Sequence, residues 1–171
     1  MSATRRLAVV RHAKSDQQAG GADHDRPINA RGRRDAPALG RWLAEHLPQP
    51  DLVLCSSALR AVQTWDLAAA ELPAAPPLDV LPTLYQTSPQ GVVAQLAQVD
   101  EVVGTLVVVG HEPVQSQLTD WLSGGVGEPD ALALLAEGFS TCAVAVLETT
   151  SSWAELGAGS CRLAAFAAPR G

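Results

Sequence analysis

Apolar residues along the chain fall into short runs with little polar alternation, separated by longer amphipathic or polar segments. The three clearest runs are residues 7–10, 51–55 and 105–109. A strand that is covered on both faces lacks polar alternation, so each run predicts a buried β-strand. Helical segments between such strands imply right-handed crossovers, which favours an α/β protein with a mostly parallel sheet.

The segments between the strands carry helix signals. We predict helices at residues 30–47, 58–72, 89–98 and 113–122. Asn29, Ser57 and Ser88 have the side chains that commonly cap a helix N-terminus. Pro37 lies inside the first helical pattern and has no backbone N–H, so a kink or a break is expected near residue 36.

The C-terminal part has a different pattern. Residues 78–81 predict a short strand, and residues 141–148 and 160–167 predict two strands joined without a helix, as in an antiparallel pair. The expected fold is a three-layer α/β/α sandwich. Its mostly parallel central sheet has about six strands, and its C-terminal strand is antiparallel. A chain of 171 residues is expected to form a single domain over residues 1–171.

Polar side chains follow three of the predicted strands. Arg11 and His12 follow the first strand, Arg60 lies shortly after the second, and His111 follows the strand at 105–109. Because the carboxyl ends of parallel strands open on one edge of a sheet, we expect these four side chains to meet. Guanidinium groups suit phosphate oxygens, and a neutral imidazole can attack phosphorus. The alternative is that each residue merely ends a strand at the surface.

Composition limits the partners of such a site. The net charge is −6 and the pI is about 5.1, which argues against a general nucleic-acid binder and requires any phosphate pocket to be a local basic cluster. No apolar run is long enough for a membrane span, and the run before Arg11 is too short for a signal peptide. Three cysteines without metal-ligand spacing are expected to be reduced and buried, in a cytoplasmic protein.

Two further groups of polar residues have competing interpretations. Asp23, His24 and Asp25 could ligate a metal, but the absence of a second ligand pair favours a solvated loop, and we expect no metal and no cofactor. Four arginines lie mostly off the apolar stripe of the helix at 30–47. They form either a solvated basic face or a surface that meets an acidic partner; they are Arg31, Arg33, Arg34 and Arg41.

Three sequence motifs together resemble the histidine phosphatase superfamily, also called the phosphoglycerate mutase-like family. The motifs are VVRHAKS, SSALRAVQT and VVVGHEP, at residues 9–15, 56–64 and 107–113. The RHAKS form and the following RPINARGRRDAP are similar to the SixA-like phosphohistidine phosphatase branch. The resemblance extends from residue 7 to about residue 122, and it implies one histidine phosphatase domain.

The resemblance implies roles for individual residues. His12 corresponds to the phosphorylated nucleophile, and Arg11, Arg60 and His111 to residues of the phosphate pocket. Ser15 stands where the family often has a hydroxyl near the phosphate, which makes it a weaker candidate for substrate binding. Ala13 replaces the glycine of the family's Arg-His-Gly triplet and narrows the conformational freedom of the backbone there.

One departure from the family pattern bears on the substrate. Many members have a glutamate general acid in the region that corresponds to residues 81–90, where this chain has no carboxylate. Esters release an alkoxide that benefits from an acid, whereas phosphohistidine releases imidazole, a better leaving group. Asp16 or Glu112 could substitute for the missing acid, although Glu112 is equally explained as a carboxylate in the first turn of a helix.

The expected function is that of a metal-independent phosphatase that works through a phosphohistidine intermediate. Its expected substrate is phosphohistidine in a protein, because the short chain lacks insertions that would cover a small substrate. The alternatives are a phosphatase of a small phosphorylated metabolite and a non-catalytic phospholigand-binding module. If neutral His12 is the nucleophile, the rate should fall in acid, and the unperturbed histidine pKa places that fall between about pH 8 and about pH 5.

Overall fold

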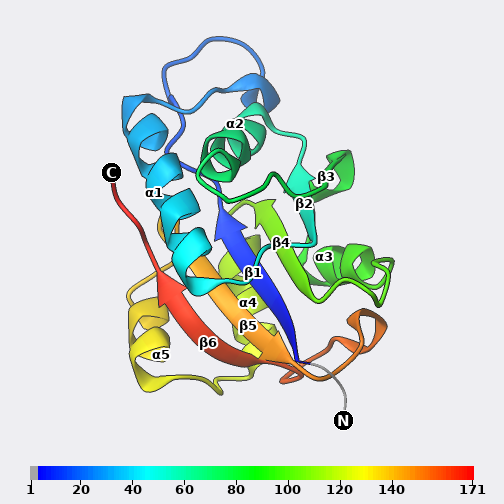
Figure 1. Cartoon of the computed structure of the whole chain (residues 1–171). Helices are drawn as coiled ribbons and strands as arrows, with labels where there is room; N and C mark the ends of the chain where they lie inside the picture. The colour runs from blue at the N-terminus through cyan, green and yellow to red at the C-terminus, as the bar shows by residue number, and fades with distance from the viewer. Residues whose placement is uncertain (1–3) are drawn as a thin grey trace.

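The computed structural model describes residues 4–171, which build one six-stranded sheet between two layers of helices (Figure 1). The strand order is β3-β2-β4-β1-β5-β6. The strands are β1 (Arg5–Arg11), β2 (Leu52–Ser56), β3 (Leu78–Leu81), β4 (Thr105–Gly110), β5 (Val144–Thr149) and β6 (Arg162–Ala167). Strands β1 to β4 are parallel, β5 is antiparallel to β1, and β6 is antiparallel to β5.

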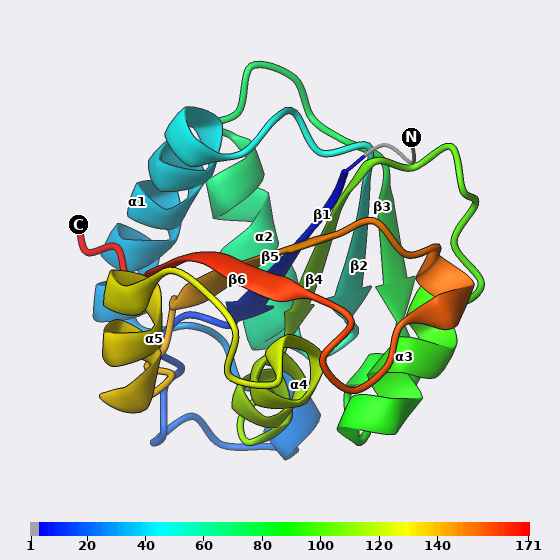
Figure 2. The same ribbon diagram turned by 90° about the horizontal axis from the view of Figure 1, so that it is seen from below.

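Five helices cover the two faces of the sheet, as Figure 2 shows. They are α1 (Ala30–His46), α2 (Leu59–Ala69), α3 (Pro89–Leu96), α4 (Val114–Ser123) and α5 (Pro129–Ala136). Helices α1 and α2 pack on one face, and α3, α4 and α5 pack on the other. Three 3₁₀ turns complete the described elements: η1 (Asp23–Asp25), η2 (Pro82–Leu84) and η3 (Trp153–Glu155).

The central strands are apolar at every position because both of their faces are buried. In β1, Leu7 and Val9 pack towards α3 and α4, whereas Ala8 and Val10 pack towards α1 and α2. All four side chains are almost completely buried. The three-layer α/β/α sandwich with a mostly parallel sheet, predicted from this pattern, is confirmed.

The helix boundaries follow the sequence signals with two exceptions. The side chains of Asn29 and Ser88 accept the expected capping hydrogen bonds from Gly32 and Gly91. The prediction for Ser57 was wrong, because Ala58 is the N-cap residue of α2 and no side chain caps that helix.

The second exception is Pro37, where a kink or a break was expected and the structure shows no break. Helix α1 is continuous through this residue over 17 residues. The buried residues Ala36 and Leu39 anchor it to the sheet on either side of the proline. Packing of this apolar stripe offsets the loss of one backbone hydrogen bond.

Helix α5 is the one helix that the sequence analysis did not indicate. Its eight residues, PDALALLA, are nearly all apolar and short, so they show no amphipathic period. The helix packs beside the edge strand β6, with Ala131 buried against the core.

Close approach of backbones fixes the position of α1. A side chain at Gly40 would place its Cβ 2.1 Å from the carbonyl oxygen of Ala68 in α2, and one at Gly32 would place it 2.4 Å from that of Lys14. Glycine therefore allows the first turn of α1 to lie directly against the loop that follows β1, and its middle to lie directly against α2.

The three cysteines are buried and free of disulfides, and they contribute to the core. Burial raises the pKa of Cys55 and of Cys142 to about 12, and it also raises that of Cys161. Cys142 and Cys161 lie just before β5 and β6 rather than within them. No helix in residues 4–171 combines the length and apolar character that crossing a membrane requires.

Candidate active site

The carboxyl ends of β1 and β4 meet the first turn of α2, which follows β2, at one cavity of about 200 Å³. All five residues that the sequence analysis singled out line this cavity: Arg11, His12, Ser15, Arg60 and His111. The imidazole rings of His12 and His111 have centroids 5.0 Å apart, although the two residues are 99 positions apart in the chain. The parallel sheet produces this meeting, because β1 and β4 are adjacent in register and end together.

His12 is held by backbone hydrogen bonds at the end of β1. Its N–H donates to the carbonyl of Gly110 over 3.0 Å, and its carbonyl accepts from the N–H of Cys142 over 3.2 Å. Cys142 has a φ of 61°, a left-handed conformation that is strained for a non-glycine residue. The strained turn at Cys142 therefore fixes the backbone of His12 from the side of β5.

The imidazole of His12 has a defined tautomer. Nδ1 lies 2.7 Å from the carbonyl oxygen of Ala13, which can only accept, so Nδ1 carries the proton and Nε2 has a free lone pair. Burial, helped by the nearby His111, Arg60 and Arg11 and opposed by the hydrogen bond to Ala13, lowers the pKa of His12 to about 3. The ring is therefore neutral at physiological pH.

His111 is the second neutral imidazole. Its Nε2 lies 2.7 Å from the hydroxyl oxygen of Ser56, at the end of β2. Burial, followed by the charge of Arg60, lowers the pKa of His111 to about 4. Its Nδ1 is buried and has no hydrogen-bond partner among the described residues. Ser56 was not singled out from the sequence, although a serine that ends a buried strand is the type of signal that drew attention to His12.

Arg11 and Arg60, two of the arginines that line the cavity, each retain an unpartnered N–H. Arg11 donates from one terminal nitrogen to the carbonyl of Phe139 over 2.7 Å, and Arg60 donates to the carbonyl and carboxylate of Asp23 over 2.8 and 3.1 Å. The Nε atoms of both side chains are buried without a partner in residues 4–171. Together with Nδ1 of His111, they give three buried, unpaired nitrogen atoms on residues that line one cavity.

A carboxylate from the loop after β1 organises the outer side of the site. Asp23 accepts hydrogen bonds from Arg26, Arg60 and the hydroxyl of Tyr85, the last over 2.8 Å. The Tyr85 hydrogen bond, followed by those from the arginines, lowers the pKa of Asp23 to about 2. We name Asp23, Arg26 and Tyr85 the η1 clamp, because they tie η1 to α2 and to the segment after β3.

The η1 clamp changes the interpretation of residues 23–25. The sequence favoured a solvated loop here, and Asp23 is indeed half exposed, but its carboxylate meets Arg60 at the start of α2. A cation in the first turn of a helix is unfavourable for the helix dipole, and the Asp23 carboxylate compensates Arg60 from within the chain. No group of three His, Cys, Asp or Glu side chains in residues 4–171 has the arrangement of a metal site.

Of the remaining candidates, Ser15 and Glu112 line the cavity. The Ser15 hydroxyl oxygen accepts from Arg26 over 3.1 Å and from Gln17 over 3.2 Å, which leaves its O–H available as a donor. Both carboxylate oxygens of Glu112 bind Ser116, which matches a helix-start role in α4. Asp16 does not line the cavity, and its carboxylate accepts from the backbone of Gln18.

Two buried polar residues support the strand ends from behind. Thr64 of α2 accepts a hydrogen bond from the N–H of Ala13 over 2.8 Å and donates to the carbonyl of Arg60 over 2.6 Å. Gln115 of α4 donates to the carbonyls of Val10 and Val108, over 2.8 and 3.3 Å. Neither residue was predicted, because a buried Thr or Gln within a helix cannot be told from an exposed one without the tertiary contacts.

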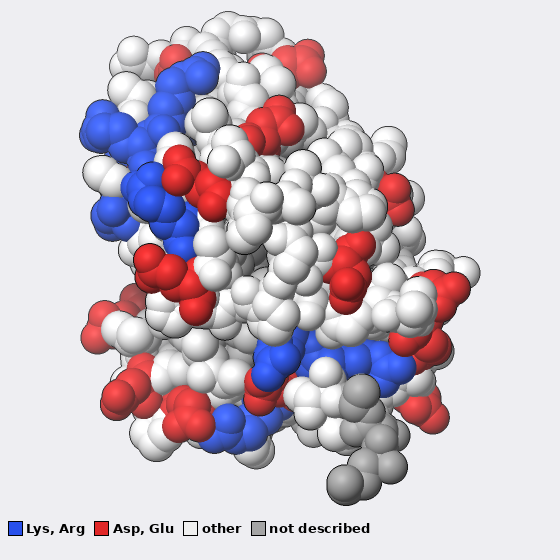
Figure 3. Space-filling view, viewed as in Figure 1, with Lys and Arg blue, Asp and Glu red and all other residues white. Residues whose placement is uncertain are grey.

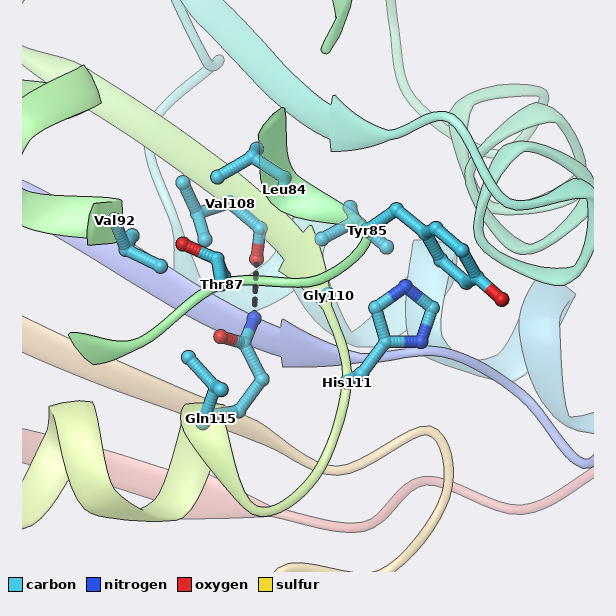
Figure 4. Close-up of a pocket in the computed structure, with 10 residues that line it drawn as sticks. Leu84, Tyr85, Thr87, Val92, Val108, Gly110, His111 and Gln115 are labelled. Atoms are coloured by element: carbon cyan, nitrogen blue, oxygen red, sulfur yellow. Dashed lines mark hydrogen bonds between the residues drawn. The ribbon is translucent and has the colours of Figure 1, made fainter. Parts of the chain in front are cut away.

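A second, smaller gap lies on the other side of His111, between α3, α4 and the segment after β3 (Figure 4). Its lining includes Leu84, Val92 and Val108, and its volume is about 10 Å³. In Figure 4 the Tyr85 ring lies beside His111, with its hydroxyl pointing away from the apolar gap. The gap has room for about one water molecule, so we treat it as imperfect packing behind His111 rather than a ligand site.

Comparison with known proteins identifies the family of the chain. Residues 7–87 match the family described as the histidine phosphatase superfamily (branch 1). An uncharacterised protein of Mycobacterium tuberculosis is 41% identical over 162 residues, which cover 94% of this chain and 100% of the relative. The chain belongs to the histidine phosphatase superfamily.

Solved structures narrow the placement within the superfamily. A protein of Nakamurella multipartitia assigned to the phosphohistidine phosphatase SixA is 31% identical, with a TM-score of 0.86 and 98% of each chain covered. The protein histidine phosphatase SixA solved with tungstate is 26% identical, with a TM-score of 0.70 and coverage of 84% of this chain and 88% of the other. This chain is a member of the SixA-like branch, in agreement with the resemblance noted in its motifs.

Proposed function

We propose that this protein is a phosphatase that removes the phosphoryl group from phosphohistidine in a protein, with His12 as its nucleophile. The observation that carries the proposal is the cluster of three buried, unpaired nitrogen atoms on Arg11, Arg60 and His111 beside a neutral imidazole. Buried donors without partners are costly in a folded protein. A phosphoryl group in the cavity would offer its three oxygens to them.

The chemistry follows from the tautomer of His12. The Nε2 lone pair attacks phosphorus and forms an N–P bond, while the bond from phosphorus to the substrate imidazole breaks. That imidazole leaves as a neutral ring when its distal nitrogen carries a proton. The hydrogen bond from Nδ1 of His12 to Ala13 keeps one proton on the phosphorylated ring, so that water can then release dihydrogen phosphate and restore neutral His12.

The arginines and His111 stabilise the transferring group. Arg11 and Arg60 neutralise charge that spreads over the equatorial oxygens of the transition state. We assign to His111 the tautomer that carries its proton on Nδ1, with the Ser56 hydroxyl donating to Nε2. The Nδ1–H is then available as a donor to the phosphoryl group. The Ser15 hydroxyl adds a further donor at the cavity wall.

The choice of phosphohistidine over an ester rests on what surrounds the leaving group. The carboxylates near the cavity already accept hydrogen bonds within the chain. Tyr85 and the arginines keep Asp23 ionised, and Glu112 binds Ser116. An ester that needs proton donation therefore meets no free acid here, whereas imidazole leaves without one. The SixA-like neighbours, which carry the phosphohistidine phosphatase name, support the same substrate class.

The test is mass spectrometry of the protein quenched during turnover of a phosphohistidine peptide. We expect phosphate on His12, at an acid-labile position, and none in a His12→Asn variant. In a parallel substrate panel, phosphohistidine peptides should be hydrolysed with a higher kcat/KM than aryl or sugar phosphates. A higher kcat/KM for the esters would overturn the substrate class, and a phosphoryl group on another residue would overturn the nucleophile.

A further inference from the structure

Many cationic residues of this acidic protein lie at the cavity or on the surface next to it. Of its twelve lysines and arginines, four line the cavity: Arg11, Lys14, Arg26 and Arg60. Four more lie close to the cavity. Three are in the first turns of α1, and the fourth is near the C-terminus and contacts Thr141; they are Arg31, Arg33, Arg34 and Arg170. Figure 3 shows a group of basic side chains over the N-terminal part of α1. We name Lys14, Arg31, Arg33, Arg34 and Arg170 the basic rim.

Backbone contacts connect the basic rim to the cavity. The N–H of Asn29, the N-cap residue of α1, donates to the carbonyl of Lys14 over 2.8 Å, so the first turn of α1 lies against the cavity wall. On the other side, Arg170 donates to the carbonyl of Thr141, which also lines the cavity. Arg170 and Arg31 both reach the buried carboxylate of Asp35, which places them next to each other.

Several charges of the basic rim are uncompensated. Arg33 and Arg34 are exposed, and no described carboxylate lies within 4.0 Å of either of them or of Lys14. The carboxylates that face this region are Asp23 and Asp35, which already pair with other arginines, and Glu112 at the cavity. The mutual repulsion of the basic rim is therefore only partly relieved within the chain.

Helix stability does not account for Arg33 and Arg34. The first turn of α1 holds no acidic residue, although the positive end of the helix dipole favours carboxylates and disfavours cations there. Each exposed cation in this turn therefore carries an unfavourable interaction with the helix dipole, which is a cost. A surface anion from a partner would remove the cost at all of these positions together.

We propose that the basic rim docks an acidic surface of the protein whose phosphohistidine enters the cavity. The cavity part of this statement rests on the proposed function. The rim residues of α1 do not line the cavity, so a small molecule bound there would not meet them, whereas a macromolecule would. A compact acidic protein surface fits better than nucleic acid, because a long polyanion would extend over the rest of a chain with a net charge of −6.

The proposal predicts binding that depends on charge and on salt. Opposite charges around a shared site raise the rate of encounter and fix orientation, and salt screens this effect. The test uses peptides that carry a stable phosphohistidine analogue with acidic, neutral or basic flanking residues. Fluorescence anisotropy then measures binding without requiring hydrolysis.

Two variants with matched charge changes separate the basic rim from net charge. Arg33→Gln with Arg34→Gln removes two rim charges, and Arg41→Gln with Arg162→Gln removes two exposed charges elsewhere. At low salt, we expect the wild type and the control to bind the acidic peptide roughly tenfold more tightly than the neutral one. The rim variant should lose most of that preference while its circular dichroism spectrum stays unchanged.

Equal affinity for the three peptides, or a preference that survives in the rim variant, would overturn the basic rim as a docking surface. Tighter binding of a short single-stranded oligonucleotide than of the acidic peptide would assign the surface to nucleic acid instead. Hydrolysis of free phosphohistidine, measured for the wild type and for the rim variant, tests the proposed function separately. If the wild type does not hydrolyse it, the phosphatase chemistry is rejected, and the binding result is unaffected.

Discussion

The two sides of the cavity are built by different means. On the side of the sheet, His12 and His111 follow strands whose backbone hydrogen bonds fix them, and both rings are neutral. On the side of the loop, the η1 clamp holds Arg60 through contacts between charged, partly exposed side chains. The sheet side therefore provides rigid groups for bond making, whereas the loop side provides adjustable charge.

Backbone support and side-chain support respond differently to mutation. A residue that is placed by β-strand hydrogen bonds keeps its position when a neighbouring side chain changes, so that its own removal produces a clean loss of function. A residue held by exposed ion pairs is stabilised weakly, because water and salt screen such pairs. We therefore expect large effects from the sheet side and small ones from the η1 clamp.

The largest effect should come from His12. His12→Asn removes the proposed nucleophile and leaves the cationic pocket in place, so the rate should fall by about 10³-fold or more, and no phosphoenzyme should form. Single-turnover assays with a phosphohistidine peptide measure this loss. Binding of inorganic phosphate, measured by calorimetry, serves as the control. Substantial residual turnover by the variant would contradict the role of His12 as the nucleophile on the sheet side of the cavity.

Arg60 joins the two sides and should show the next largest effect. Arg60→Ala removes a proposed donor to the phosphoryl oxygens, and the loss of such a donor should cost on the order of 10²–10³ in rate. Arg60→Lys keeps the charge but loses the planar fork, so that it should recover only part of the activity. Steady-state kinetics of both variants measure the contribution of geometry beyond charge. Equal rates for Lys and Arg at this position would mean that charge alone matters.

The pH dependence should reflect the lowered histidine pKa values. An unperturbed histidine would protonate between about pH 8 and about pH 5, and the sequence analysis expected the rate to fall there. Burial is the main reason that the pKa of His12 falls to about 3, so the ring stays neutral down to about pH 5. Protonation of His12 should therefore not lower kcat/KM above that pH. The kcat/KM profile tests this, and a decline centred near pH 6.5 would show that His12 is more solvated than its position indicates.

The same histidines link stability to pH. Their pKa values are lower in the folded than in the unfolded protein, so the unfolded state takes up protons first as the pH falls below about 6.5. The contribution of the two histidines to the free energy of unfolding is therefore fully present above that pH. It is lost progressively as the pH falls towards their folded-state pKa values. Thermal unfolding of His111→Asn should show a smaller decrease in Tm between neutral pH and about pH 4.5 than the wild type.

The smallest effect should come from the η1 clamp. Asp23→Asn removes the negative charge beside Arg60 but keeps an oxygen that accepts from Tyr85 and Arg60. Competition for Arg60 should weaken, so that inorganic phosphate inhibits roughly two- to fivefold more strongly, with kcat changed little. Asp25→Asn, in the same turn, is the control. A fall in kcat as large as that of Arg60→Ala would mean that Asp23 contributes to catalysis as strongly as the residues on the sheet side.

Hydrophobic pattern predicted the sheet well, because buried parallel strands have an unmistakable composition. It also predicted which residues follow the strands, and adjacent strand ends then bring Arg11, His12 and His111 together without further information. The pattern could not indicate Asp23 or Tyr85, whose contacts with Arg60 depend on how two irregular segments fold back. It also missed the helix α5, whose short apolar sequence shows no period. Ser56 was overlooked although it ends a buried strand, as the residues before His12 do.

The buried sulfur atoms have a consequence for chemical resilience. With the pKa of Cys55 and Cys142 near 12 and Cys161 also shifted upward, none of the three thiols ionises under ordinary conditions. Peroxides and alkylating reagents attack the thiolate, so they have little to react with while the fold is intact. A dephosphorylation reaction built on imidazole in such a fold would continue under oxidising stress that silences enzymes with a cysteine nucleophile.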